Sequence, residues 1–506
     1  MTREQVIWIS IAVYALFIIL VSVFSSRSSK DISDFTVGKR NAGAWMSAFS
    51  YGTAYFSAVM FIGYSGKSGW QYGGWSVLIG IGNAIVGSLF AWLVLAKKTR
   101  QITHNHQIKS MPQLFAIRFK SEKIKLFSVA VIFIFLLPYS ASVYKGLTSV
   151  CSVLLNIDET VCMVVIAMAS AAMVIFGGYL ATLKADFIQG LIMLFGVIAL
   201  IVAVIRCDTV GGVANGFKAL QTSTQALNLT AKDYIGLTAT VLMTSLGTWG
   251  LPQMIHKYYG IRDDKEVSRG TIISTIFAIV VSGGGYFIGS FSHLFYNDLS
   301  EIPNGNSNPD YLVPNMLLNA NLSNILVAVV LVLLIAASVS TLTAITITAS
   351  STLTMDFVEN KIFKTHSPKK TLYTTQIISG IFVLLSYLIA NSNTPILDMM
   401  SYSWGIISGC FLAPYLISLY SKKINRFGAW CGMIGGFIVA LPPVICKLFL
   451  PNATLLNFGT IKDLGPHFAC ASMILSFVFC FAGTAIANKL NLASSARNDE
   501  FYIEKQ

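Results

Sequence analysis

Residues 324–356 read NILVAVVLVLLIAASVSTLTAITITASSTLTMD, and the interpretation of the whole chain starts from this stretch. It opens as an apolar run, and a helix needs about 20 such residues to cross a membrane. From Ala336 onward hydroxyl side chains replace aliphatic ones, yet no formal charge appears before Asp356. Ala337, Ser340 and Thr341 stand at positions i, i+3 and i+4, so they share one helix face.

Two interpretations of this hydroxyl-rich face are open at this point. Two hydroxyl oxygens beside a backbone carbonyl form a set of hard oxygen ligands, which suits a small cation. Small and hydroxylated residues also let membrane helices approach closely, and on this stretch alone packing is the favoured interpretation. The rest of the sequence is needed to distinguish ion binding from packing.

The chain as a whole has the composition of a membrane protein. Of its 506 residues, 55% are hydrophobic and 11% are charged, and apolar runs of membrane length recur throughout. We expect an all-α polytopic membrane protein with about 13 transmembrane helices and no appended soluble domain. The predicted spans are 4–24, 45–66, 74–96, 126–150, 160–178, 185–206, 236–256, 271–296, 325–348, 372–391, 397–419, 428–447 and 466–488.

The basic residues predict how the chain is oriented. Alternate loops between the predicted spans hold 27 of the 35 lysines and arginines, and such loops face the cytoplasm. With an odd number of spans, this places the N-terminus outside the plasma membrane and the C-terminus in the cytoplasm. Because the basic residues follow the loops and form no single soluble face, the net charge of +13 does not indicate nucleic-acid binding.

Two of the predicted spans contain interruptions. The second includes GTAYFS at 52–57, which is poor in helix formers, and the seventh includes GTWGLPQ at 247–253, with two glycines and a proline. Non-helical backbone at membrane depth must face protein or a water-filled cavity. Paired breaks five spans apart are typical of transporters built from 5+5 inverted repeats, with the site between the breaks. Ordinary helix kinks are the alternative.

An acidic residue enters the sixth span. Residues 177–190 read GGYLATLKADFIQG, and Asp186 stands where the apolar run begins. Ionisable residues inside the membrane are costly and are usually functional. A carboxylate at a helix start can also simply stabilise the helix N-terminus, and the two roles are compatible.

Taken together, these stretches resemble the sodium:solute symporter family, with a pattern nearest to its proline and pantothenate permeases. The run 177–190 is similar to the family's glycine, aspartate and glutamine signature, and 336–356 is similar to its hydroxyl-rich ninth helix. The turn GLPQ at 250–253 resembles the family's Gly-x-Pro-His turn.

The resemblance covers about residues 5–450 and implies a leucine-transporter-like core. In that core the first inverted repeat is 45–206, and the second is 236–419. The peripheral parts are then 1–44, which holds the first helix and a cytoplasmic loop, 428–488, which holds the C-terminal helices, and the cytoplasmic tail 489–506.

The same resemblance implies one sodium site between the second and ninth spans. Its ligands are the backbone carbonyls of Thr53, Phe56 and Ala337 and the hydroxyls of Ser340 and Thr341. All five positions suit this chemistry, because hydroxyl side chains stand where a side chain must coordinate. The resemblance therefore favours ion binding on the hydroxyl-rich face.

Some family members bind a second cation, at a site that corresponds here to Asp186, Thr343 and Ala344. Threonine can coordinate a cation and alanine cannot. We therefore expect one sodium, with Asp186 and Thr343 as candidates for a second.

The solute is expected to bind beside the two breaks. Met60 stands near a position where sugar transporters of the family carry amides, and methionine cannot make those hydrogen bonds. A small amino acid such as proline, or a small carboxylate such as pantothenate or a monocarboxylate, fits better. The residues expected to line the pocket are Ser57, Met60, Tyr139, Thr248, Trp249 and Gln253.

The predicted function is sodium-coupled import of this solute by alternating access. A proton-coupled transporter of the same fold and a transporter-like sensor without transport are the alternatives. An enzyme is not expected, because Asp186 is the one catalytic-type residue found near membrane depth. The expected partners are the solute, sodium and the lipid bilayer, with no nucleic acid and no obligate protein partner.

Overall fold

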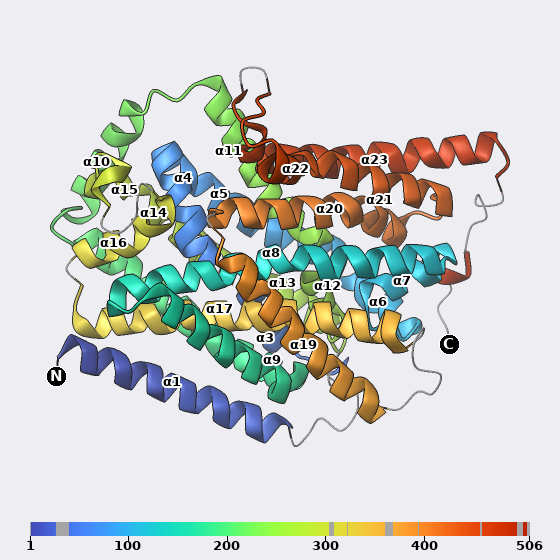
Figure 1. Cartoon of the computed structure of the whole chain (residues 1–506), viewed down its shortest axis with the longest axis horizontal. Helices are drawn as coiled ribbons and strands as arrows, with labels where there is room; N and C mark the ends of the chain where they lie inside the picture. Colours follow the sequence, from blue (N-terminus) through green and yellow to red (C-terminus); the bar gives the residue numbers. More distant parts are fainter. Residues whose placement is uncertain are drawn as a thin grey trace.

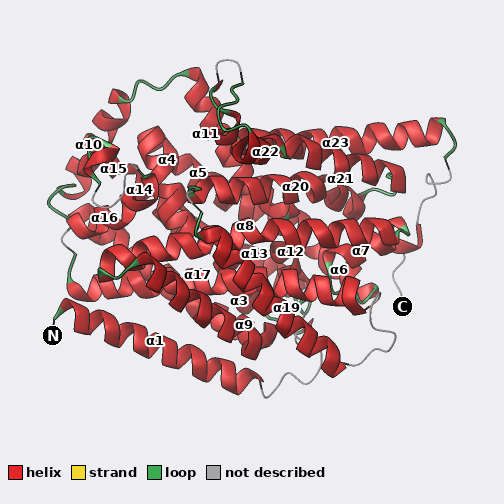
Figure 2. Ribbon diagram, viewed as in Figure 1, coloured by secondary structure: helices red, strands yellow, loops and turns green. Residues whose placement is uncertain are grey.

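The computed structural model describes residues 2–26, 40–302, 308–320, 322–359, 368–392, 394–455, 458–492 and 499–502. Within these ranges the regular structure is helical, apart from two isolated bridges (Figure 2). Residue 1 and residues 27–39 of the predicted segment 1–44 lie outside the described residues, as do 493–498 and 503–506 of the predicted tail.

The α-helices carry the labels of Figure 1. They are α1 (Arg3–Ser26), α3 (Ala44–Tyr55), α4 (Ser65–Tyr72), α5 (Val77–Gly82), α6 (Lys97–Asn105), α7 (Met111–Phe119), α8 (Glu122–Leu155), α9 (Glu159–Arg206), α10 (Gly212–Ala226), α11 (Ala231–Leu246), α12 (Pro252–Tyr259), α13 (Asp264–Ala278), α14 (Gly284–Ser290), α15 (Ser292–Phe295), α16 (Leu312–Asn319), α17 (Asn324–Leu353), α19 (Pro368–Ala390), α20 (Ile396–Tyr420), α21 (Arg426–Ala440), α22 (Pro442–Phe449) and α23 (Gly465–Lys489).

Short π-helical and 3-10 segments continue or connect these helices. The π-helical ones are η2 (Val59–Tyr64), η4 (Asn83–Phe90), η5 (Trp92–Ala96), η7 (Ile279–Gly283) and η10 (Thr354–Val358). The 3-10 ones are η3 (Gly73–Ser76), η6 (Gly247–Gly250), η8 (Leu299–Glu301), η9 (Pro309–Tyr311), η12 (Ile461–Asp463) and η14 (Asp499–Tyr502).

Among the described residues, 10 helical segments are long and apolar enough to cross a membrane. The three predicted spans outside this set are 45–66, 160–178 and 236–256. The first and third of these are the interrupted spans. In the first, α3 is too short to qualify, and the part after the break belongs to the qualifying segment Val59–Asn105. In the third, α11 and α12 are both too short to qualify alone. The second forms the first part of α9, which continues helically through the connection that the sequence predicts before 185–206.

Helix α17 lies at the centre of the molecule. It packs against α1, α3, α8, α9 and α19, and every residue from Ala336 to Thr352 is buried. In Figure 1 it runs along the long axis, roughly parallel to α8 and α20. The hydroxyl-rich half of α17 therefore has protein on all sides, so its hydroxyls need partners inside the protein.

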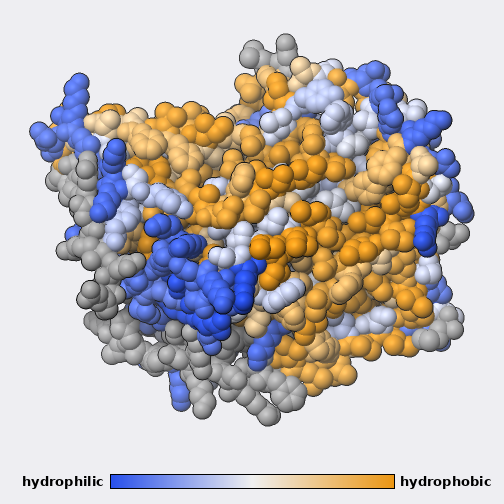
Figure 3. Space-filling model, turned by 180° about the vertical axis from the view of Figure 1, so that it is seen from behind, coloured by the Kyte–Doolittle hydropathy of each residue, from blue (hydrophilic) through white to orange (hydrophobic). Residues whose placement is uncertain are grey.

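The surface has the distribution expected of a protein in a bilayer. Hydrophobic residues cover much of the middle of the molecule, and hydrophilic residues gather toward its two ends (Figure 3). Large apolar side chains of α1 and α19 are exposed, for example Val13 and Ile377. Such faces are stable in contact with lipid.

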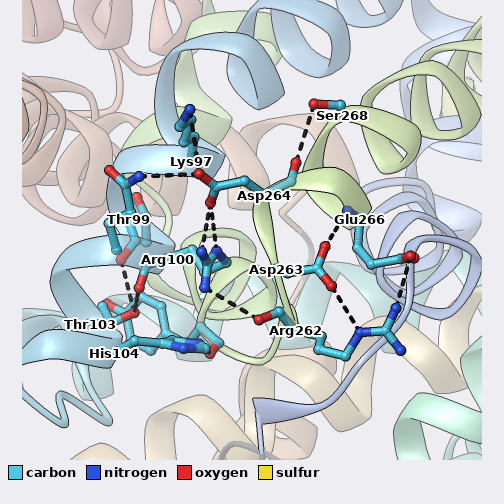
Figure 4. Close-up of polar contacts among 12 residues, drawn as sticks. Lys97, Thr99, Arg100, Thr103, His104, Arg262, Asp263, Asp264, Glu266 and Ser268 are labelled. Carbon is cyan, nitrogen blue, oxygen red and sulfur yellow. Dashed lines mark hydrogen bonds and ion pairs between the residues drawn. The ribbon is translucent and has the colours of Figure 1, made fainter.

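A charged network ties helices together at the end where α6 lies (Figure 4). Arg100 of α6 donates to the Asp264 carboxylate of α13 at 2.6 and 3.0 Å. The buried Glu266 lies 3.1 Å from the Arg262 guanidinium and accepts from the Ala44 N–H at 2.6 Å. Because Ala44 begins α3, this network fixes the starts of α3 and α13 against α6.

Candidate functional site

The second predicted span breaks at Phe56. Helix α3 ends at Tyr55, and Phe56 has extended torsions, with φ −106° and ψ 109°. Helical bonding resumes at Ser57, whose hydroxyl accepts from the Val59 N–H at 3.2 Å and whose carbonyl accepts from the Met60 N–H at 3.0 Å. The break therefore places the last carbonyls of α3 beside the first N–H groups of η2.

The seventh predicted span breaks at Leu251. Helix α11 passes into η6, Leu251 is extended with φ −82° and ψ 120°, and Pro252 begins α12. Proline suits a first helical position, because its missing N–H would have no helical partner there. The Leu251 carbonyl accepts from the N–H groups of Met254 and Ile255, each at 3.1 Å. Each predicted repeat thus opens with an interrupted helix.

The two breaks are connected to each other and to α20. The Tyr55 hydroxyl donates to the Thr244 carbonyl at 2.6 Å, across the two interrupted spans. The Ser408 hydroxyl of α20 donates to the Gly247 carbonyl at 2.6 Å. A Cβ at Gly250 would lie 2.8 Å from the Cα of Ser408, so glycine is required for this close approach.

Four of the five predicted sodium ligands meet where the end of α3 packs against α17. The Thr341 hydroxyl lies 3.0 Å from the backbone carbonyls of both Thr53 and Ala337. The Ser340 hydroxyl oxygen lies 2.9 Å from the Thr53 hydroxyl oxygen. All four residues are 0% exposed. The hydroxyl-rich face of α17 therefore packs against α3, and the contact between the two helices is made of oxygen atoms.

Phe56, the fifth predicted ligand, stands at the C-terminal end of α3. Its N–H donates to the Gly52 carbonyl at 2.9 Å, and its ring stacks on that of Tyr55 with 4.1 Å between centroids. A helix C-terminus carries partial negative charge on its carbonyls, which favours a cation. The position of Phe56 is therefore suited to the carbonyl ligand that the sequence predicts.

Asp186 of α9 joins this oxygen cluster. Its Oδ1 accepts from the Ser340 hydroxyl at 2.5 Å, and its Oδ2 accepts from the Ser50 hydroxyl. The ammonium of Lys257 lies 3.2 Å from the same Oδ2 and donates to the Ser50 hydroxyl at 2.8 Å. Asp186 is 0% and Lys257 3% exposed, so this is a fully buried ion pair.

Lys257 is the residue whose role the sequence analysis misses. It directly follows the predicted span 236–256, so the sequence analysis places it among the 27 basic residues of the cytoplasmic loops. The structure corrects this, because α12 continues to Tyr259 and carries Lys257 in its last turn against α3 and α17. The available signal is Pro252, which suits a first helical position, because a helix of two turns from there includes Lys257.

Thr343 was predicted as a further ligand for a second cation. Its hydroxyl donates to the Val339 carbonyl of its own helix at 2.7 Å. The participation of Thr343 in a second site stays a prediction.

The predicted solute-binding residues are all buried, and several already have partners. The Thr248 hydroxyl donates to the Ser245 carbonyl at 2.8 Å. The Trp249 indole N–H donates to the Val86 carbonyl at 3.0 Å, which directs this side chain toward the third predicted span. The methyl group of Met60 lies against α14, as an added Cβ at Gly285 would meet it.

Tyr139 and Gln253 have buried polar atoms without a hydrogen-bond partner in the described part of the chain. These atoms are the Tyr139 hydroxyl oxygen and both amide heteroatoms of Gln253. The indole nitrogen of Trp404 on α20 is also buried and unpaired, and its ring stands perpendicular to that of Tyr139 at 5.5 Å. The sequence does not single out Trp404, because α20 is apolar along most of its length.

Comparisons with known proteins agree with this architecture. A model of the sodium:solute symporter family matches residues 35–436. The sodium/proline symporter of Haemophilus influenzae is 25% identical over 506 residues, covering 96% of this chain and 97% of that protein. The sodium/pantothenate symporter of the same organism is 25% identical over 454 residues, covering 86% of this chain and 90% of that protein.

A solved structure shows the same fold. The substrate-bound, outward-open form of a Na⁺-coupled sialic acid symporter matches with a TM-score of 0.77, covering 98% of this chain and 99% of that one. The sequences are 16% identical, so this likeness concerns the fold. It confirms the predicted class, a polytopic helical protein with a leucine-transporter-like core.

Proposed function

The chain belongs to the sodium:solute symporter family, and from this premise we propose that it imports a small organic solute by sodium-coupled symport. The observation that carries the proposal is the buried oxygen cluster of Thr53, Ala337, Ser340 and Thr341 between two helices of different repeats. Phe56 completes the proposed ligand set at the break in the second span.

Sodium would have a structural effect at this position. Neutral hydroxyl and carbonyl oxygens are ligands that a hard cation prefers, and the C-terminal end of α3 adds partial negative charge. An ion held between Thr53 and Thr341 would tie α3 to α17, and its departure would release them. Entry of one positive charge also draws on the membrane potential, which supplies about 2.3 kcal/mol per 100 mV.

Coupling requires that sodium and solute each increase the affinity for the other. The geometry offers a direct route, because Phe56 of the ion site is followed by Ser57 of the predicted solute site. Ordering the break around sodium would fix the backbone that faces the solute. This reciprocal effect does not require a long-range pathway.

The unpaired polar atoms support a solute that accepts hydrogen bonds. The Tyr139 hydroxyl, the Trp404 indole N–H and the Gln253 amide nitrogen can each donate a hydrogen bond. An unpaired buried polar group costs about 1–3 kcal/mol. A carboxylate would satisfy such donors, and the aromatic rings would hold an apolar body. Proline and pantothenate, in the names of the relatives, both carry a carboxylate. We propose a small amino acid or carboxylate as the solute.

Uptake into proteoliposomes tests this proposal. Labelled proline, other small amino acids, pantothenate, short monocarboxylates and a sugar would be offered with and without an inward sodium gradient. We expect sodium-stimulated uptake of one carboxylate-bearing compound. Equal uptake driven by a proton gradient without sodium would contradict sodium coupling, and uptake of the sugar alone would contradict the solute class.

The orientation forms part of the proposal. The distribution of basic residues supports an extracellular N-terminus and a cytoplasmic C-terminus. A green fluorescent protein fused after Gln506 would then be fluorescent and protected from protease in intact cells. Digestion of this reporter from outside would contradict the orientation.

A further inference from the structure

The ion pair of Asp186 and Lys257 lies where the proposed sodium cluster continues toward the cytoplasmic end of α12. The Ser340 hydroxyl contacts both the Thr53 hydroxyl and Asp186 Oδ1, so the cluster and the ion pair share a residue. The ammonium approaches Asp186 on its other oxygen, at 3.2 Å. Asp186 is thus bonded on both oxygens, by Ser340 on one and by Ser50 and Lys257 on the other.

A buried carboxylate among hydroxyls needs a positive counter-charge. A metal cation or an ammonium can supply it, and both bind to oxygen atoms at short range. In this chain the ammonium of Lys257 already supplies it, with the Ser50 hydroxyl as an additional ligand at 2.8 Å. A metal cation on Asp186 would have to share the carboxylate with a like charge.

We propose that the Lys257 ammonium is a built-in cation that takes the place of a second sodium, so that the chain binds one sodium per transport cycle. This inference rests on the proposed function, because it concerns the number of ions that the symporter couples. Lys257 acts here as a fixed charge beside the sodium site. It is a residue that sets ion stoichiometry and leaves the ligands of the first sodium unchanged.

The proposal also explains why a lysine stays in the core. A buried ion pair is often no more stabilising than well-packed apolar residues of the same volume. A pair that served packing alone would therefore gain little from its charges. A pair that touches Ser340 controls the charge next to the ion site.

Binding of radioactive sodium to the purified protein in detergent tests this without knowledge of the solute. The wild type should bind one sodium. Lys257→Met should bind two, because Asp186 then lacks the ammonium and can hold a metal cation together with the Ser50 and Ser340 hydroxyls that already contact it. Asp186→Asn should weaken the single site by about tenfold, because the ammonium repels sodium without its carboxylate. The double variant, Lys257→Met with Asp186→Asn, should bind one sodium with nearly wild-type affinity.

Two further variants serve as controls. Lys257→Arg keeps the charge and should still bind one sodium. Lys265→Met removes an exposed lysine beyond the end of α12 and should match the wild type. If Lys257→Met does not fold, the comparison of Asp186→Asn with the double variant still tests the charge effect.

The outcomes separate this inference from the proposed function. One sodium in Lys257→Met, or unchanged affinity in Asp186→Asn, would overturn the built-in cation and leave sodium-coupled symport intact. No saturable sodium binding in the wild type would overturn both. Two sodium ions in the wild type would also overturn the inference while supporting the coupling ion.

Discussion

The hydroxyl of Thr341 joins two helices whose contacting residues are 288 positions apart in the chain. One oxygen atom lies within 3.0 Å of a carbonyl in its own helix and of a carbonyl at the end of α3. A serine at this position would keep the oxygen, whereas an alanine would remove it. The proposed site depends on individual hydroxyl and carbonyl oxygens of this kind, because few formal charges are available in the core.

Thr341→Ala should lower the apparent sodium affinity by about tenfold or more, since it removes a ligand and a link to Thr53. Thr341→Ser should retain most of it. Thr346→Ala is the control, because that buried hydroxyl on the same helix has no partner in the described residues. Sodium titration of uptake is the measurement, and equal affinities in all three variants would refute the ligand assignment.

Asp310 provides a prediction of pH dependence. It precedes α16, its Oδ2 accepts from the Ile396 N–H at 3.1 Å, and burial raises the pKa of its carboxyl above the ordinary value of 3.8. A raised pKa in the folded state means that the protonated form is favoured there, so its stabilising contribution is lost as pH rises through that pKa.

Asp310→Asn mimics the protonated carboxyl and keeps the acceptor for Ile396. The variant should therefore unfold at a higher temperature than the wild type at pH 7, and the difference should shrink as the pH falls toward 4. Melting curves in detergent across this range provide the measurement. A difference that is constant with pH would show that titration of Asp310 is not the cause.

At the scale of elements, the breaks depend on how closely α20 approaches. Gly247 and Gly250 belong to η6, and both lie against α20, where Ser408 bonds the first and would clash with a side chain on the second. The approach is thus set by backbone atoms. Pro252 then restarts the helix in a fixed direction.

Gly250→Ala should abolish transport and lower stability, because the added Cβ would lie 2.8 Å from the Ser408 Cα and 3.1 Å from the Leu412 nitrogen. Backbone atoms cannot move aside as a flexible side chain can. Gly283→Ala is the matched control, because no atom lies within 4 Å of its added Cβ. Folded yield and uptake should distinguish them, and similar behaviour of the two variants would contradict the packing argument.

At the scale of the whole molecule, polar links at both ends constrain how the helices move. The network around Glu266 joins α3, α6 and α13 at one end. At the other end, the Lys67 ammonium of α4 lies 3.4 Å from the Asp398 carboxylate of α20. The second link connects the continuation of the broken second span to a helix of the other predicted repeat.

Lys67→Met should lower stability more than the double variant Lys67→Met with Asp398→Leu, because the single change leaves a buried carboxylate without its partner. The Asp398 side chain is 6% exposed, so solvent screening is weak. We expect a coupling energy of about 1–3 kcal/mol in a double-mutant cycle of thermal unfolding. Strict additivity would show that the pair does not hold the two helices together.

The sequence by itself determined the membrane class, most of the spans, the two breaks and the candidates for the ion site. These features follow local rules: apolar length, the helix-breaking action of glycine and proline, and hydroxyls at helical spacing. Only the tertiary structure decided that Lys257 pairs with Asp186, that Trp249 turns toward Val86, and that Trp404 faces Tyr139. These contacts depend on how helices distant in sequence pack, which periodicity within one helix does not specify.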